Sequence, residues 1–224
     1  MFLHLMKSIS QLMTWYKRSI QILSCMLFTM PTYAASSHQV TGYVMHVQIT
    51  PAICALDQSK QKQRQCLEGY SLTIAGLMPE VHAGQNCTAK TAARLSPIQE
   101  KVVSRVMPEE QARIQLWQEV GGCVPMSASQ YFRTMINFAE RLKIPANLTS
   151  AETVDVNRED LIQQFRKLNP ALPSNGIQLS CQSSRFDQIL TEVQICYQRN
   201  GKYKQCAQHV MATCPNEFTI KGSY

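Results

Sequence analysis

The chain has 224 residues, 45% of them hydrophobic, and a formal net charge of +7 at pH 7. This length suits one domain behind a short leader, and no internal repeat or low-complexity segment divides it. The mild positive charge permits an anionic partner but does not demand one, because modest excess charge also serves solubility. The common nucleophile-elbow, Walker, zinc-protease and dinucleotide motifs are absent, which excludes those enzyme classes.

Residues 1–34 have the pattern of a secretory signal. Lys17 and Arg18 form a basic segment, and residues 19–31 are mostly apolar. That apolar stretch is shorter than the ~20 residues that a transmembrane helix needs. A small-residue cleavage site ends at Ala34.

Cleavage after residue 34 predicts a single mature domain, residues 35–224, in a periplasm or outside the cell. An uncleaved anchor helix and a lipid anchor at Cys25 are the alternatives. The apolar stretch continues past Cys25 and is short. Simple secretion without a stable membrane span is therefore the better reading.

Eight of the nine cysteines follow the leader. An even number behind a signal peptide indicates disulfides formed in an oxidising compartment. No Cys-x-x-Cys pair occurs, which argues against a zinc site, and we expect neither a metal nor a cofactor. The pairing cannot be read from the number alone. The cysteines are Cys54, Cys66, Cys87, Cys123, Cys181, Cys196, Cys206 and Cys214.

The first half of the mature chain predicts two strands. Residues 40–49 alternate between apolar and polar, with His46 on the polar face. A second strand begins near residue 71, and we expect Gly76 to end it. Residues 57–65 between the strands predict a solvated polar loop.

Four helices are expected after the second strand. Ser96 and Ser127 each begin a capping box, and Asn157 precedes another helix. Apolar residues recur at helical spacing behind these caps. The predicted helices cover residues 97–106, 109–120, 128–142 and 157–168.

The last third of the chain predicts strands. Residues 177–180 form one, and residues 188–198 and 203–209 flank Asn200-Gly201, a strong hairpin signal. A strict two-residue turn would not place Cys196 opposite Cys206. A bridge between them would need a longer loop or a bulge.

Residues 70–80 read Tyr-Ser-Leu-Thr-Ile-Ala-Gly-Leu-Met-Pro-Glu. This stretch resembles an active-site segment of the ribonuclease T2 family, Phe-Thr-Ile/Leu-His-Gly-Leu-Trp-Pro, and a second stretch resembles another. Residues 115–123 resemble His-Glu-Trp-x-Lys-His-Gly-Thr-Cys, with matches at Trp117, Gly121 and Cys123. The resemblance covers nearly all of the mature chain and is closest to bacterial, periplasmic ribonuclease I.

The resemblance implies an α+β, ribonuclease T2-like fold with a central antiparallel sheet flanked by helices. It also implies four disulfides. We expect the protein to be a monomer. The implied pairs are Cys54–Cys66, Cys87–Cys123, Cys196–Cys206 and Cys181–Cys214.

The family cleaves RNA through attack of the ribose 2′-hydroxyl on phosphorus, which gives a 2′,3′-cyclic phosphate. One histidine removes the 2′ proton and another protonates the leaving oxygen. The resemblance places these histidines at Ala75 and Val120. It places an assisting glutamate at Leu116, a lysine at Glu119 and an auxiliary histidine near Gln115. Since alanine, valine and leucine cannot exchange protons, it predicts a catalytically inactive member, a pseudoenzyme.

The cleft residues that could still bind a substrate are Met78, Trp117 and Gln115. Met78 stands where the family has a tryptophan, and it can pack against a base without offering a stacking face. Trp117 is the better candidate for a core residue. We expect binding of single-stranded RNA, a nucleotide or a protein at most.

Two alternatives remain. The first is an active endoribonuclease with a relocated histidine pair, for which His82 and His46 are the candidates. Such a pair must reach one phosphate, because proton transfer requires the geometry first. The other histidines behind the leader are His38 and His209. The second alternative is an interaction protein that does not use the cleft.

Overall fold

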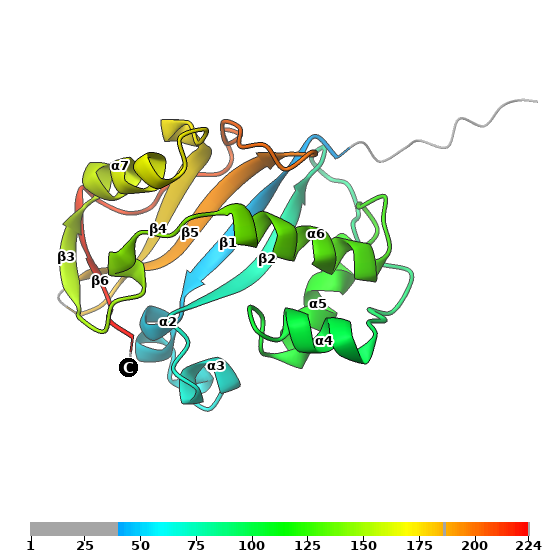
Figure 1. Ribbon diagram of the computed structural model, residues 1–224, viewed down its shortest axis with the longest axis horizontal. Helices are drawn as coiled ribbons and strands as arrows, with labels where there is room; N and C mark the ends of the chain where they lie inside the picture. Colours follow the sequence, from blue (N-terminus) through cyan, green and yellow to red (C-terminus); the bar gives the residue numbers. More distant parts are fainter. Residues whose placement is uncertain (1–39, 186, 224) are drawn as a thin grey trace, which may run out of the picture. The chain divides into compact units, whose positions relative to one another are not determined.

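Across residues 40–185 and 187–223, which the computed structural model describes, six strands form one sheet (Figure 1). The strand order is β2-β1-β5-β6-β3, and β4 pairs with β5. All pairs are antiparallel except β5 with β6, so the sheet is mixed. The strands are β1 (Gly42–Ile49), β2 (Leu72–Glu80), β3 (Val154–Asn157), β4 (Ile177–Ser183), β5 (Gln188–Gln198) and β6 (Glu217–Ile220).

The predicted leader, with Cys25, and His38 lie outside the described residues. The cleavage site and the domain boundary at residue 34 therefore stay predictions. Within the described part of the chain, no helix is long and apolar enough to cross a bilayer.

Helices flank the sheet, which gives the expected α+β architecture. Figure 1 shows α6 lying across strands β5, β1 and β2. The four predicted helices form as α4 to α7, and their ends lie within a few residues of the predicted ones. Both serine capping boxes form. The helices are α2 (Thr50–Leu56), α3 (Arg64–Leu67), α4 (Pro97–Val103), α5 (Glu110–Val120), α6 (Ala128–Arg141) and α7 (Arg158–Leu168), with 3-10 turns η1 (Gln58–Lys60), η2 (Ala146–Leu148) and η3 (Ser174–Gly176).

The core lies between α6 and the sheet because both elements present an apolar face there. Met45 and Ile49 of β1 are fully buried, as the alternation of that strand predicts. Tyr43 meets Phe138 of α6 edge to face, with ring centroids 6.2 Å apart. Burial of such residues is the main favourable term in folding this domain.

The expectation that Gly76 ends the second strand is wrong. The register passes from His46 opposite Gly76 to Val47 opposite Ile74, which leaves Ala75 as the extra residue of a β-bulge. A bulge absorbs one residue and bends the strand without ending it. β2 continues through Pro79 because it is an edge strand, where a missing N–H breaks no ladder bond.

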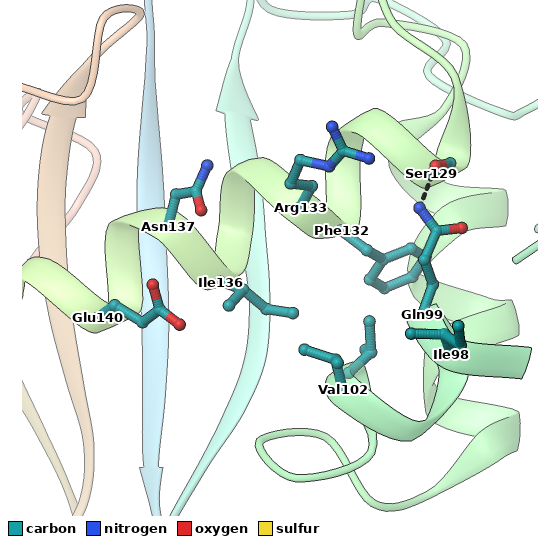
Figure 2. A pocket seen from close by; sticks show the side chains of 10 residues that line it. Ile98, Gln99, Val102, Ser129, Phe132, Arg133, Ile136, Asn137 and Glu140 are labelled. Atoms are coloured by element: carbon teal, nitrogen blue, oxygen red, sulfur yellow. Dashed lines mark hydrogen bonds between the residues drawn. The ribbon is translucent and has the colours of Figure 1, made fainter. Parts of the chain in front are cut away.

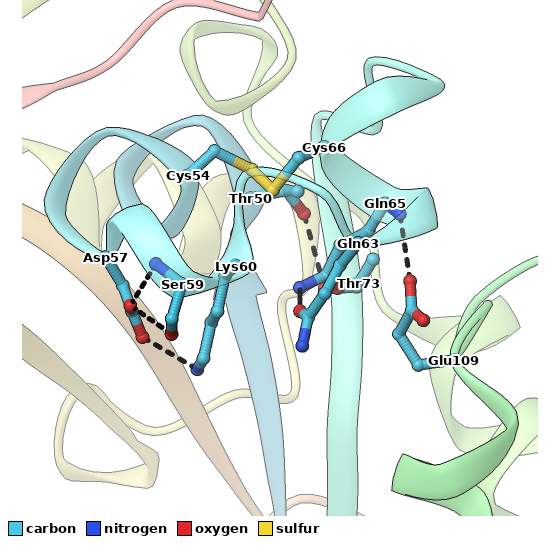
Figure 3. Close-up of a disulfide and its surroundings, with 10 residues drawn as sticks. All are labelled: Thr50, Cys54, Asp57, Ser59, Lys60, Gln63, Gln65, Cys66, Thr73 and Glu109. Atoms are coloured by element: carbon cyan, nitrogen blue, oxygen red, sulfur yellow. Dashed lines mark hydrogen bonds and ion pairs between the residues drawn. A yellow bond between two sulfur atoms is a disulfide. The ribbon is translucent and has the colours of Figure 1, made fainter.

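The segment predicted as a polar loop is partly helical. The η1 turn falls within it, α3 begins at its last two residues, and the Cys54–Cys66 disulfide joins α3 to α2 (Figure 3). Asp57 caps η1 by accepting a hydrogen bond of 3.0 Å from the amide of Ser59. Such local bonds from aspartate to the backbone order short turns that hydrophobic periodicity does not reveal.

The predicted second strand of the hairpin, residues 203–209, does not form. Gly201 has φ of +79°, and the turn is a three-residue loop with its glycine in the left-handed region. After a single bridge between Tyr197 and Tyr203 the chain leaves the sheet. The amide of Cys206 instead donates to the carbonyl of Asn175 at 2.9 Å.

Four disulfides join cysteines among the described residues. Each links segments that the sheet and its connections already bring together, with Cα–Cα distances between 4.7 and 5.8 Å. They are the pairs that the family resemblance implies. They are Cys54–Cys66, Cys87–Cys123, Cys181–Cys214 and Cys196–Cys206.

Candidate functional site

The two segments that carry the positions assigned to catalysis by the resemblance pack against each other, β2 against α5. We call Ala75, Leu116, Glu119 and Val120 the β2–α5 junction. A Cβ on Gly76 would lie 2.7 Å from Cδ1 of Leu116, so this glycine is what allows the helix to approach the strand. The fold therefore brings the two sequence motifs together at this contact.

The chemistry of the β2–α5 junction is apolar. Leu116 and Val120 are each only 3% exposed and belong to the hydrophobic core. Ala75 is half-buried at the bulge, and Glu119 is exposed. The junction thus contains no imidazole, and its only ionisable side chain faces solvent.

Tyr131 of α6 bonds the backbone of the edge strand β2 next to the junction. Its hydroxyl accepts a bond of 3.1 Å from the amide of Leu77 and donates one of 2.9 Å to the carbonyl of the same residue. Burial raises the pKa of the Tyr131 hydroxyl, which stays neutral and acts as a structural link.

Trp117 is also a core residue. It is 3% exposed, its indole N–H donates to the carbonyl of Thr91 at 2.8 Å, and its ring lies 5.9 Å from that of Tyr131. Gln115, by contrast, is exposed on α5. Of the three candidate binding residues, Met78 lines the cavity described next.

A cavity of about 440 Å³ with both polar and apolar lining residues lies beside the junction, on the sheet face that carries His46. Segments far apart in the sequence build it: β1, the end of β2, β4, β5 and the loop before Cys214. We call it the His46 cavity. It is lined by Val44, His46, Met78, Pro79, Glu80, Ser180, Gln194, His209, Val210, Met211 and Thr213.

A carboxylate orients His46 within this cavity. Oε1 of Glu192 lies 2.9 Å from Nδ1 of His46 and accepts a bond of 2.7 Å from Nε2 of Gln194. Burial would raise the pKa of Glu192, but its bonds and charge interaction with His46 outweigh burial and hold that pKa below the usual range. In the tautomer that donates from Nδ1, Nε2 of His46 keeps its lone pair.

A second histidine, His209, lines the same cavity from the loop after β5. Sequence reasoning placed His209 near a hairpin strand and did not connect it with His46. The exposed His82, which had been the other candidate, is not among the residues lining this cavity. The structure therefore brings together His46, His209 and Met78.

An ion pair is buried at the edge of the His46 cavity. Nζ of Lys204 pairs with the carboxylate of Glu80, which is only 5% exposed. The two side chains meet over Gly42, where a Cβ would collide with both. Glu192 and Lys204 were not singled out in the sequence, because their roles depend on the pairing of β1 with β2 and β5.

Within residues 40–185 and 187–223, no three histidine, cysteine, aspartate or glutamate residues are grouped so that they could hold a metal ion. The His46 cavity instead offers hydrogen-bond acceptors. Oε1 of Gln194 is buried without a hydrogen-bond partner, and Nε2 of His46 is an acceptor in the tautomer above. This cavity suits a ligand that presents N–H or O–H donors.

Comparison with known proteins identifies one family. The family model described as ribonuclease T2 matches residues 41–206. RNase MC1 from bitter gourd seeds has a similar fold, with a TM-score of 0.60 at 17% identity over 80% of this chain and 98% of that one. The SF11-RNase of Nicotiana alata gives 0.64 at 12% identity over 82% and 100%. No curated protein matched in the sequence comparison.

Proposed function

Because this chain belongs to the ribonuclease T2 family, we propose that it is a member that does not cleave RNA by the two-histidine mechanism. The observation that supports this is the burial of Leu116 and Val120 in the core of the β2–α5 junction. With Ala75 as the third position, no side chain there can remove the 2′ proton or protonate the 5′ oxygen. A positioned general acid or base typically raises the reaction rate ~10²–10⁴-fold.

The remaining function is binding, and the His46 cavity is its candidate site. Crystal structures of RNase MC1 variants contain 5′-UMP or 5′-GMP, and one of RNase NT contains 5′-AMP. Met78 provides an apolar wall against which a base can pack, and Gln194 provides an unpaired acceptor. We propose a nucleotide or single-stranded RNA as the ligand of a secreted or periplasmic protein.

The test combines cleavage and binding on the oxidised mature protein. Labelled single-stranded RNA is incubated with it to detect 2′,3′-cyclic ends, and 5′-UMP, 5′-GMP and 5′-AMP are titrated by calorimetry. We expect binding without cleavage. Gln194→Leu should weaken the binding, and Gln115→Leu, at an exposed position of α5, should leave it unchanged. Absence of binding to RNA and to every nucleotide would overturn the binding proposal and favour an interaction protein that does not use the cleft.

One observation favours a second candidate, a relocated catalytic pair: His46 and His209 share the His46 cavity. Nε2 of His46, oriented by Glu192, would accept the 2′-hydroxyl proton as O2′ bonds to phosphorus. The bond from phosphorus to O5′ would break, and protonated His209 would donate its proton to that oxygen. The product would be a 2′,3′-cyclic phosphate and a free 5′-hydroxyl.

Alanine variants separate the two candidates. If purified protein cleaves RNA, and His46→Ala and His209→Ala each lower the rate ~10²-fold or more, the relocated pair is correct. His82→Ala is the matched control, because His82 is exposed and does not line the cavity. Cleavage that survives all three substitutions would point to a contaminating nuclease.

A further inference from the structure

An apolar groove runs between α4 and α6, away from both regions described above (Figure 2). Its volume is about 260 Å³, and Phe132 forms its buried floor. Two apolar side chains of α4 remain at its edge in contact with solvent: Ile98 is 79% exposed and Val102 is 38% exposed. In Figure 2, Val102 and Ile136 point toward one another across the groove. Exposed apolar side chains around a hollow are typical of an interaction surface.

The other wall of the groove carries opposite charges at its two ends. Arg133, Asn137 and Glu140 lie along the exposed face of α6. Arg133 and Glu140 are seven residues apart, which is two helical turns or about 10 Å. Among the residues that the structure describes, neither takes part in an ion pair.

We propose that this groove is a homodimer interface in which α6 of two copies pack antiparallel about a two-fold axis near Ile136. In such an isologous contact residue i meets j and j meets i. Arg133 of each copy then faces Glu140 of the other, so both charges find a partner. The protruding Ile98 of each copy covers the apolar groove of the second.

The charge pattern is what selects a second copy as the occupant. A two-fold axis midway between Arg133 and Glu140 makes the wall complementary to itself, whereas an unrelated partner would have to supply the reverse pattern independently. The groove is small compared with the 1,200–2,000 Å² of surface that stable complexes bury. We therefore expect a weak dimer whose population depends on concentration. This inference is independent of the proposed nucleotide binding and differs from the sequence-based expectation of a monomer.

The experiment is sedimentation velocity on the oxidised mature protein from about 10 μM to about 1 mM. We expect the dimer fraction to rise across this range and to fall when salt is added, because exposed ion pairs are screened. Arg133→Glu and Glu140→Arg should each abolish the dimer, since each change places like charges opposite one another. Lys167→Glu on α7 is the control for the change in net charge and should leave the dimer intact.

Charge exchange gives the sharper result. A mixture of the Arg133→Glu and Glu140→Arg proteins pairs opposite charges at both contacts, so it should form a heterodimer although neither protein dimerises alone. The doubly exchanged chain should dimerise as the parent does, and Ile98→Asp should not. Circular dichroism checks that each variant is folded. A parent that stays monomeric at 1 mM, or a dimer insensitive to both charge changes, would overturn the proposal.

Discussion

The β2–α5 junction and the His46 cavity are neighbours built on the same strand, but their chemistry is opposite. The junction holds Leu116 and Val120 in the core and has no buried ionisable group of its own. The His46 cavity gathers two histidines and a buried carboxylate. Met78 lies next to both regions. Its Cε is 3.4 Å from the position of a Cβ on Gly76, and Met78 also lines the His46 cavity.

The comparison shows that an apolar and a more polar region can lie next to each other on one strand. The buried side chains of the junction gain stability by excluding water, as any core residue does. In the His46 cavity, Glu192 bonds the side chains of both His46 and Gln194 and so orients them. Polar groups kept for a function commonly lower the stability of a protein, so the His46 cavity is where a function is expected.

The largest expected effect comes from restoring histidines to the junction. We expect Ala75→His combined with Val120→His to raise RNA cleavage at least ~10²-fold over the parent, because a proton acceptor and a donor return together. Single-turnover cleavage of labelled RNA measures the change. Each single variant serves as a control and should gain far less. No gain in a folded double variant would contradict the assignment of these two positions.

The next largest effect tests the buried ion pair of the His46 cavity. Lys204→Met leaves the carboxylate of Glu80 buried without its partner, which should lower the free energy of unfolding by about 3 kcal/mol. Urea unfolding at neutral pH measures this. Adding Glu80→Gln to the variant should recover part of the loss, because the unpaired charge is then gone. An unchanged unfolding midpoint would mean that water already solvates the pair.

A smaller effect is expected at the edge of β2. Tyr131→Phe removes the hydroxyl that bonds both the amide and the carbonyl of Leu77 on that edge, which should cost about 2 kcal/mol. Tyr70→Phe is the control at a tyrosine that is only half-buried, whose hydroxyl lies 3.5 Å from the carbonyl of Ser104 and also bonds the side chain of Glu68. Equal destabilisation by the two changes would show that the hydroxyl of Tyr131 is not a specific link.

The smallest effect concerns pH. The pKa of Glu192 is lowered in the folded protein, so its ionised form stabilises the fold above the ordinary value of 4.5, and this stability is lost as pH falls below that value. Glu192→Gln should remove this dependence. The difference in unfolding free energy between parent and variant should narrow from about pH 6 to about pH 3. Glu217→Gln, at an exposed carboxylate, is the control, and a constant difference would contradict the role of Glu192.

Local sequence signals predicted the elements whose ends are set by residues close by in the sequence. The serine caps at Ser96 and Ser127 begin helices where expected because the capping bonds lie within four residues. The bulge at Ala75 was not predictable, since it exists only as a register shift against β1. The strands β3 and β6 were missed because each has only four residues, too few for alternation to stand out.

By itself, the sequence determined the family and the fold class, because these depend on residue identity in order along the chain. Only the tertiary structure decided which side chains face one another. The contact of His46 with Glu192, the shared cavity with His209 and the groove beside Arg133 and Glu140 depend on strand register and helix packing. Register is set by non-local pairing, in which a shift of one residue turns each side chain to the other face of the sheet.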